Sequence, residues 1–193
     1  MRKQPLYQYS KDVIDIPNIA IQEDSDAGMH FRYALEIPFL KSESLKPVLV
    51  IMKNPSRADR TQSDKTVSNI LRFCHEKYSK VILANVYPLI SPDPQDLKKF
   101  IQSPVFVAHM NKNERVIQEL LGETDDVIIA WGATDLGIQA NESFKQQSEN
   151  LKNVFKNRQK NIFAMRFHSS ESPWHPRNWE KGYELELYRW KDK

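Results

Sequence analysis

Residues 54–59, Asn-Pro-Ser-Arg-Ala-Asp, bring an amide, a hydroxyl, a cation and a carboxylate together in one short polar segment. Asn54 and Asp59 could orient a water molecule or accept a hydrogen bond, while Pro55 stiffens the turn between them. The alternative is a structural turn whose Ser or Asp side chain caps a following helix. We expect Asp64 to be such a cap, because a helical pattern begins at the next residue.

Asn85 ends the otherwise apolar run 81–84. A buried Asn must satisfy its amide donors and its carbonyl oxygen, so Asn85 either ties two loops together or binds a ligand. A carboxamide also matches the donor and acceptor pattern of a pyrimidine edge, which is the chemistry of base recognition.

The segment 166–179 carries two histidines and two tryptophans directly after an apolar run. Histidine can donate a hydrogen bond to an oxyanion or a carbonyl group, and an aromatic ring can stack on a base. His168, His175 and Trp174 are therefore candidate site residues, and the alternative is a structural loop held by its tryptophans. The other histidines are scattered and form no helical metal-binding pair, so we expect no metal site.

The composition is that of an ordinary globular protein. The 193 residues are 40% hydrophobic and 27% charged, which argues against a disordered chain. The longest apolar run, residues 47–52, is far shorter than the roughly 20 residues of a membrane span. No apolar segment follows the basic N-terminus, so we expect no signal peptide and a cytoplasmic protein. The single cysteine, Cys74, cannot form an internal disulfide and lies in a helical pattern that favours a buried thiol.

Four apolar runs predict the strands that position these loops. They cover residues 48–52, 81–86, 127–131 and 161–166, and helical patterns lie between them at 66–74, 95–101, 108–121 and up to about 155. The alternating segment 30–37 is typical of an edge strand, and the first 30 residues are polar and irregular.

Continuous apolar strands that alternate with helices imply a parallel sheet covered on both faces. We therefore predict one α/β domain over residues 1–193, with residues 1–30 as an irregular extension. Its expected architecture is a three-layer αβα sandwich with a central, mostly parallel sheet of four to five strands. Ligands of open α/β sheets bind beyond the carboxyl ends of the strands, where the polar segments described above would converge.

Six short motifs also occur in order along the chain, at residues 54–59, 64–66, 85–87, 93–97, 130–132 and 174–176. This set resembles a bacterial and phage family called domain of unknown function 1643, over about residues 31 to 179. More distantly, the motif order is similar to that of the uracil-DNA glycosylase superfamily. That resemblance implies a uracil-DNA glycosylase-like fold.

The distant resemblance implies hydrolysis of the N-glycosidic bond of a damaged or modified base in DNA, a hypermodified phage base included. Asn54 or Asp59 would position the attacking water, and Asn85 would read the base edge. A histidine would stabilise the departing base. His168 has the matching distance from its strand, whereas His175 has the matching proline after it, so both stay candidates. This chemistry needs no metal and no organic cofactor.

Further contacts follow from the same resemblance. The base or its surroundings would touch Pro55, Ser56, Tyr87, Trp131 and Trp174, and DNA phosphates would touch Arg57, Arg60 and Arg177. The formal net charge of +3 neither demands nor excludes a nucleic-acid partner, so these local arginines matter more than the total. We expect a monomer that binds DNA, does not bind membranes and acts in DNA repair or phage defence.

Two other classes of function remain open at this point. The same rim could hold a nucleotide or a damaged DNA end without cleaving it, or it could hydrolyse a free nucleoside or nucleotide.

Overall fold

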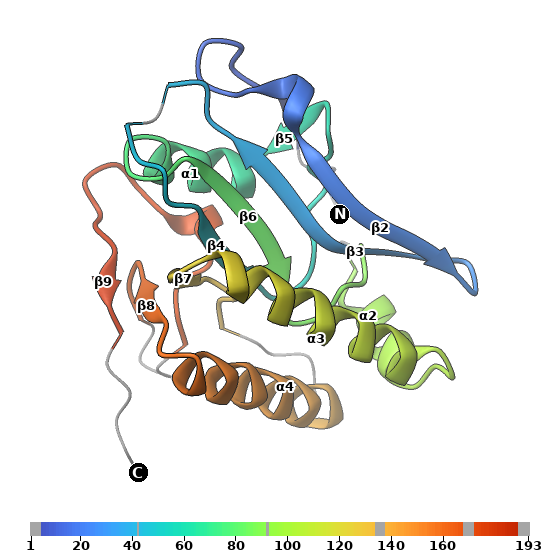
Figure 1. The fold of residues 1–193 in the computed structure, drawn as a ribbon. Helices are drawn as coiled ribbons and strands as arrows, with labels where there is room; N and C mark the ends of the chain where they lie inside the picture. Colours follow the sequence, from blue (N-terminus) through green and yellow to red (C-terminus); the bar gives the residue numbers. More distant parts are fainter. Residues whose placement is uncertain (1–4, 42, 92, 134–137, 168–171, 189–193) are drawn as a thin grey trace.

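The computed structural model describes residues 5–41, 43–91, 93–133, 138–167 and 172–188 of the chain. Its main feature is a seven-stranded sheet with helices on both faces (Figure 1). In spatial order the strands are β2 (Ala20–Asp26), β3 (Met29–Pro38), β6 (Lys80–Asn85), β4 (Val48–Met52), β7 (Asp126–Ile129), β8 (Asn161–Ala164) and β9 (Glu186–Leu187). A separate two-stranded sheet consists of β1 (Leu6–Gln8) and β5 (Gln62–Asp64).

The α/β class is confirmed, but the prediction of a mostly parallel sheet of four to five strands is wrong. The central strands β6, β4, β7 and β8 run parallel, whereas the pairings β2–β3, β3–β6 and β8–β9 are antiparallel. The sheet is therefore mixed. β2 is mostly exposed and β9 has only two residues, so neither carries the continuous apolar run by which the four parallel strands were recognised.

The alternating segment 30–37 lies inside the sheet rather than at its edge. It forms β3, which pairs with β2 on one side and β6 on the other. The expected irregular extension contains β1, the short 3-10 helix η1 (Ile16–Asn18) and β2. Ala27 and Gly28 join β2 to β3, and both have positive φ, at 49° and 74°. This is the backbone that a two-residue hairpin turn needs to match the twist of the strands.

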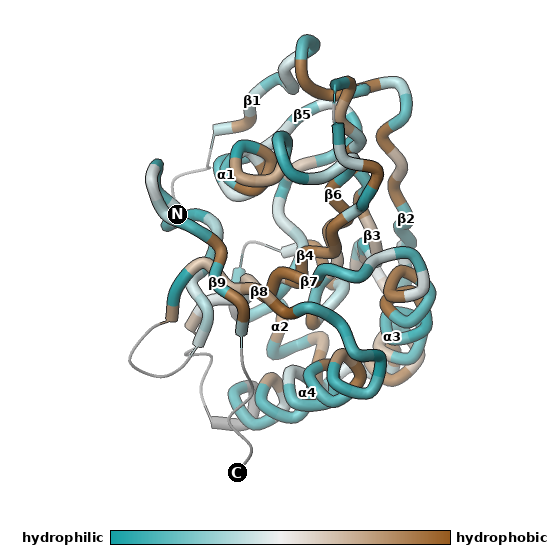
Figure 2. The backbone as a smooth tube through the Cα atoms, turned by 60° about the vertical axis from the view of Figure 1, so that its left-hand side comes forward, coloured by the Kyte–Doolittle hydropathy of each residue, from teal (hydrophilic) through white to brown (hydrophobic). Residues whose placement is uncertain are grey.

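The central strands are buried on both faces, as continuous apolar runs predict. Every residue of β4 is buried, and its side chains alternate between two clusters. One cluster packs under α2 (Pro94–Ile101), α3 (Phe106–Glu123) and α4 (Ile138–Asn157), and the other under α1 (Lys65–Cys74). Figure 2 shows the apolar central strands between helices that carry both polar and apolar residues. Cys74, the last residue of α1, is buried in the cluster under that helix, as expected.

The order of the parallel strands along the chain differs from their order in the sheet. β6 and β7 follow β4 in sequence but lie on its opposite sides. The connection that leaves β4 leads to β6 on one side, and the connection that leaves β7 leads to β8 on the other. The switch point therefore lies between the carboxyl ends of β4 and β7, which is the position where open α/β sheets bind ligands. Among the described residues, no helix combines the length and apolar character that a bilayer crossing requires.

Candidate functional site

The polar loop that follows β4 is tied to the loop that follows β6. The Asn54 amide nitrogen donates to the Ser91 carbonyl oxygen at 2.9 Å. Because the nitrogen is turned toward Ser91, the amide oxygen lies on the opposite branch of the side chain. Asn54 therefore holds a defined orientation with an acceptor oxygen, the group that can align a water molecule.

Asp64 fastens the same loop to the first turn of α1. One carboxylate oxygen accepts from the Val67 backbone N–H at 3.0 Å, and the other accepts from the Arg57 backbone N–H at 2.9 Å. The predicted helix cap is thus confirmed. Asp64 is only 3% exposed, so a buried carboxylate positions this loop.

A buried arginine binds the backbone of the loop that follows β4. Arg32 of β3 is 2% exposed and donates through Nη1 to the Ala58 carbonyl oxygen. Burial lowers the pKa of Arg32 to about 10, while the nearby carboxylate of Asp64 opposes this shift. The guanidinium therefore stays charged at neutral pH and holds the loop backbone in place.

Asp59 organises its own turn. One carboxylate oxygen accepts from the Thr61 N–H at 2.7 Å, the Thr61 hydroxyl at 2.8 Å and the Gln62 N–H at 2.8 Å. Burial raises the pKa of Asp59, but these hydrogen bonds outweigh it and the pKa is lowered. Asp59 is thus an ionised turn former, and one of its carboxylate oxygens is occupied by three donors within its own turn.

The carboxyl end of β6 is clamped from the helical layer. Asn85 is fully buried beside Met52, and Asn113 of α3 donates to its carbonyl oxygen at 2.9 Å. Tyr87 is also fully buried, and its hydroxyl donates to Ser143 of α4 at 2.9 Å. The Tyr87 ring packs in the core, so it is not displayed on the surface for stacking.

His175 reaches this rim from the loop after β8. It lies against Gly132 of the β7 end so closely that a Cβ on the glycine would stand 2.9 Å from the His175 Cβ. Gly132 also has a φ of +75°, so both the short distance to His175 and the backbone conformation favour glycine at this position. Asn69 of α1 fixes the following turn by donating to the Pro176 carbonyl oxygen at 2.8 Å.

The protonation state of His175 follows from its surroundings. Its pKa is lowered to about 4, mainly by burial and also by the positive charges of Lys53 and Arg177, against an opposing effect of Asp64. Its Nδ1 accepts from the Arg177 backbone N–H at 3.2 Å. The ring is therefore neutral at pH 7 and carries its proton on Nε2, which makes that nitrogen a hydrogen-bond donor. His168 lies outside the described residues.

Lys53 also lies at this rim, and sequence reasoning gave it no role. Its Nζ donates to the Ala133 carbonyl oxygen at 2.9 Å and lies 5.7 Å from the centre of the Phe144 ring. Burial lowers the pKa of Lys53 to about 8. The signal was available, because a lysine that directly follows a fully buried strand must place part of its stem in the protein.

The remaining candidates divide between core and surface. Trp131 is 3% exposed and packs edge-on to Phe144, so its ring belongs to the core. Trp174 is half-buried and lies edge-on to Tyr183. Pro55 is buried, Ser56 is half-buried, and Arg57, Arg60 and Arg177 are exposed. Trp174 is thus the candidate stacking residue nearest the surface.

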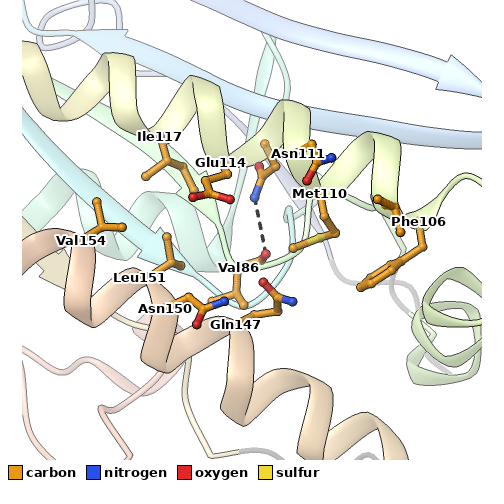
Figure 3. A pocket seen from close by; sticks show the side chains of 12 residues that line it. Val86, Phe106, Met110, Asn111, Glu114, Ile117, Gln147, Asn150, Leu151 and Val154 are labelled. Carbon is orange, nitrogen blue, oxygen red and sulfur yellow. Dashed lines mark hydrogen bonds between the residues drawn. The ribbon is translucent and has the colours of Figure 1, made fainter.

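A separate cleft of about 270 Å³ lies between α3 and α4, behind the end of β6. Figure 3 shows Val86 at its base, with Met110 and Gln147 on opposite walls. Asn113 also lines the cleft and donates to the Val86 carbonyl oxygen at 3.4 Å. Its lining comes from these two helices and Val86, not from the loop after β4, so the cleft is distinct from the candidate site.

The sequence matches the model of a known protein family. A sequence model of the family described as "Protein of unknown function (DUF1643)" matches residues 32–177, a span that runs from the buried Arg32 to the turn after His175. No curated protein and no solved structure matches the chain.

Proposed function

The chain belongs to the DUF1643 family, and on that premise we propose that it hydrolyses the N-glycosidic bond of a damaged or modified base in DNA. A hypermodified phage base falls within this class of substrate. The proposal includes the finer expectation for the fold, namely that the parallel strands and their loops are arranged as in uracil-DNA glycosylases.

The observation that carries the proposal is the neutral His175 at the carboxyl ends of the parallel strands. When an N-glycosidic bond breaks, the base departs with negative charge on its ring and carbonyl oxygen. A neutral imidazole with its proton on Nε2 can donate a hydrogen bond to that charge while it keeps the proton. The lowered pKa keeps His175 in this form throughout the neutral range.

Two amides supply the other parts of the reaction. Asn54, held through Ser91, would accept a hydrogen bond from the water that attacks the sugar at C1′. Asn85 of the adjacent strand end is fully buried in the free protein, so it would have to be uncovered on binding before it contacted the edge of the base. Exposed arginines on the same loops, Arg57 and Arg177, supply the positive charge that DNA phosphates need.

The test is the release of a base. Duplex and single-stranded oligonucleotides that carry uracil, deaminated purines or glucosylated cytosines are incubated with the protein, and abasic sites are read as alkali-labile breaks. We expect breaks with at least one substrate, and a loss of about 100-fold in rate for His175→Ala and Asn54→Ala. The matched controls are His30→Ala and Asn153→Ala, which remove exposed side chains elsewhere.

Two results would redirect the interpretation. DNA or nucleotide binding without base release from any substrate would favour a binding protein, the second candidate class. Release of a base from free nucleosides but not from DNA would instead favour a nucleoside hydrolase.

A further inference from the structure

The proposed hydrolysis leaves one reactive group of the site without a task. The Lys53 amine lies at the switch point of the sheet, on the loop that holds Asn54, and its charge acts on His175. Hydrolysis by a positioned water needs no amine. The proposed hydrolysis therefore does not explain the burial and the contacts of Lys53.

With respect to the described residues, Lys53 is a half-buried amine and not half of an ion pair. Its described polar contact is the Ala133 carbonyl oxygen, and within the described part of the chain no carboxylate forms a salt bridge with it. Burying an ammonium group without a counter-charge is costly, and the neutral amine avoids that cost. A carbonyl acceptor suits both forms, because it needs only one N–H and leaves the nitrogen lone pair of the neutral amine available.

These surroundings increase the share of the reactive form. With a pKa of about 8, Lys53 is neutral in about a tenth of the molecules at pH 7, against less than about a thousandth for an ordinary lysine. The neutral amine is the form that attacks carbonyl carbons, and desolvation is a known way to activate lysine for this purpose.

We propose that Lys53 is a nucleophile that forms an imine with the aldehyde of an abasic deoxyribose in DNA. The inference rests on the proposed function, since the aldehyde at C1′ is the product that base removal leaves. It adds a second activity at the same site, cleavage of the DNA strand beside the abasic sugar.

The chemistry balances without any further reagent. The neutral Nζ adds to C1′, and the aldehyde oxygen leaves as water, so that a C=N bond replaces the C=O bond. Protonated, the imine draws electrons from C2′, which loses a proton to solvent. The C3′–O bond then breaks, and the 3′ phosphate leaves with the electron pair. Hydrolysis of the imine returns the free amine.

Imine formation can be tested without knowing which base is recognised. The probe is a duplex oligonucleotide with one preformed abasic site, incubated with the full-length protein and sodium cyanoborohydride, which reduces an imine to a stable amine. We expect a covalent protein–DNA adduct on a denaturing gel, and peptide mass spectrometry should place the sugar remnant on Lys53. Lys53→Arg keeps the charge and should lower adduct formation more than about tenfold, whereas Lys145→Arg, at an exposed position of α4, should not.

The pH dependence separates this amine from surface lysines. Trapping by Lys53 should rise with pH and level off near pH 8, while trapping by an ordinary lysine keeps rising toward about pH 10. An adduct that persists in Lys53→Arg, or that maps to another residue, would overturn the inference. Binding of the abasic duplex without the reductant, measured by anisotropy, shows whether Lys53→Arg has lost the chemistry or only the DNA.

The two proposals fail in distinguishable ways. Base release without trapping would leave a simple hydrolase and refute the role of Lys53. Trapping at Lys53 without base release from any substrate would refute the glycosylase proposal and leave an enzyme that acts on abasic sites made by others.

Discussion

Replacing Gly132 with Ala tests whether the close approach of β7's end to His175 sets the properties of the site. The added Cβ would stand 2.9 Å from the His175 Cβ, about 0.5 Å inside an ordinary contact, so His175 or the Gly132 backbone must move. Gly28→Ala is a matched control, because Gly28 has nearly the same φ, +74°, and no atom within 4 Å of the new Cβ.

Both variants should lose the same backbone energy, about 1–2 kcal/mol for a non-glycine residue in the left-handed region. Gly132→Ala should lose about 1–3 kcal/mol more, the usual cost of overpacking. Urea unfolding measures this difference directly. If the two variants lose equal stability, the close contact between Gly132 and His175 does not exist as described.

A second measurement on the same variant needs no substrate. In the wild type the His175 ring should titrate at a pKa of about 4, and this can be followed by NMR of its ring nitrogens. Displacement by the methyl group that Gly132→Ala adds should hydrate the ring and raise its pKa toward the ordinary value of about 6.5. Base release or imine trapping should fall by about 10- to 100-fold, because small misplacements of catalytic groups are costly. An unchanged titration in Gly132→Ala would refute the burial argument.

Three further outcomes follow from the same contacts. The folded-state pKa of His175 is below its unfolded value, so stability should be complete above about pH 6.5 and fall by about 1–3 kcal/mol as the pH drops toward 4; His175→Ala should remove that slope in urea titrations. Asn113→Asp should destabilise more than Asn113→Ala, because it places a buried carboxylate against the carbonyl oxygens of Asn85 and Val86; thermal unfolding compares the two. Asp64→Ala should cost about 1–2 kcal/mol from the lost cap, and amide exchange should increase at Arg57 as the loop is released.

The sequence revealed the parts of the fold whose signal is local. The β4 strand and the start of α1 were placed correctly, because an unbroken apolar run and a capping Asp64 are visible in a few consecutive residues. β2 and β9 were missed because their pairing depends on partners far along the chain, and their own residues are largely exposed. An exposed strand carries little apolar pattern for periodicity to detect.

In the candidate site, too, local features could be predicted and contacts between distant residues could not. The position of the Asn54 loop at a strand end could be predicted, since the strand itself is unmistakable. The tasks of individual side chains could not, because they depend on contacts made in space. Tyr87 and Trp131 were expected to contact a base yet pack in the core, and Asp59 folds its own turn. The approach of His175 to Gly132 joins two distant parts of the sequence and has no local signature at all.

The shifts of Lys53 and His175 have one direction and one main cause, which bears on what the site can hold. Burial disfavours the charged form of each, so both pKa values are lowered, and the charge of Lys53 adds to the shift of His175. Asp64 is the carboxylate that opposes the shift of His175, but its oxygens already bind two backbone N–H groups. An anion that enters beside them would therefore meet two groups able to take up protons, and its own charge would raise both pKa values. A departing base or a DNA phosphate has that charge, so the protonated form of Lys53 would stabilise either ligand, while the bound anion would lower the share of neutral Lys53 that imine formation needs.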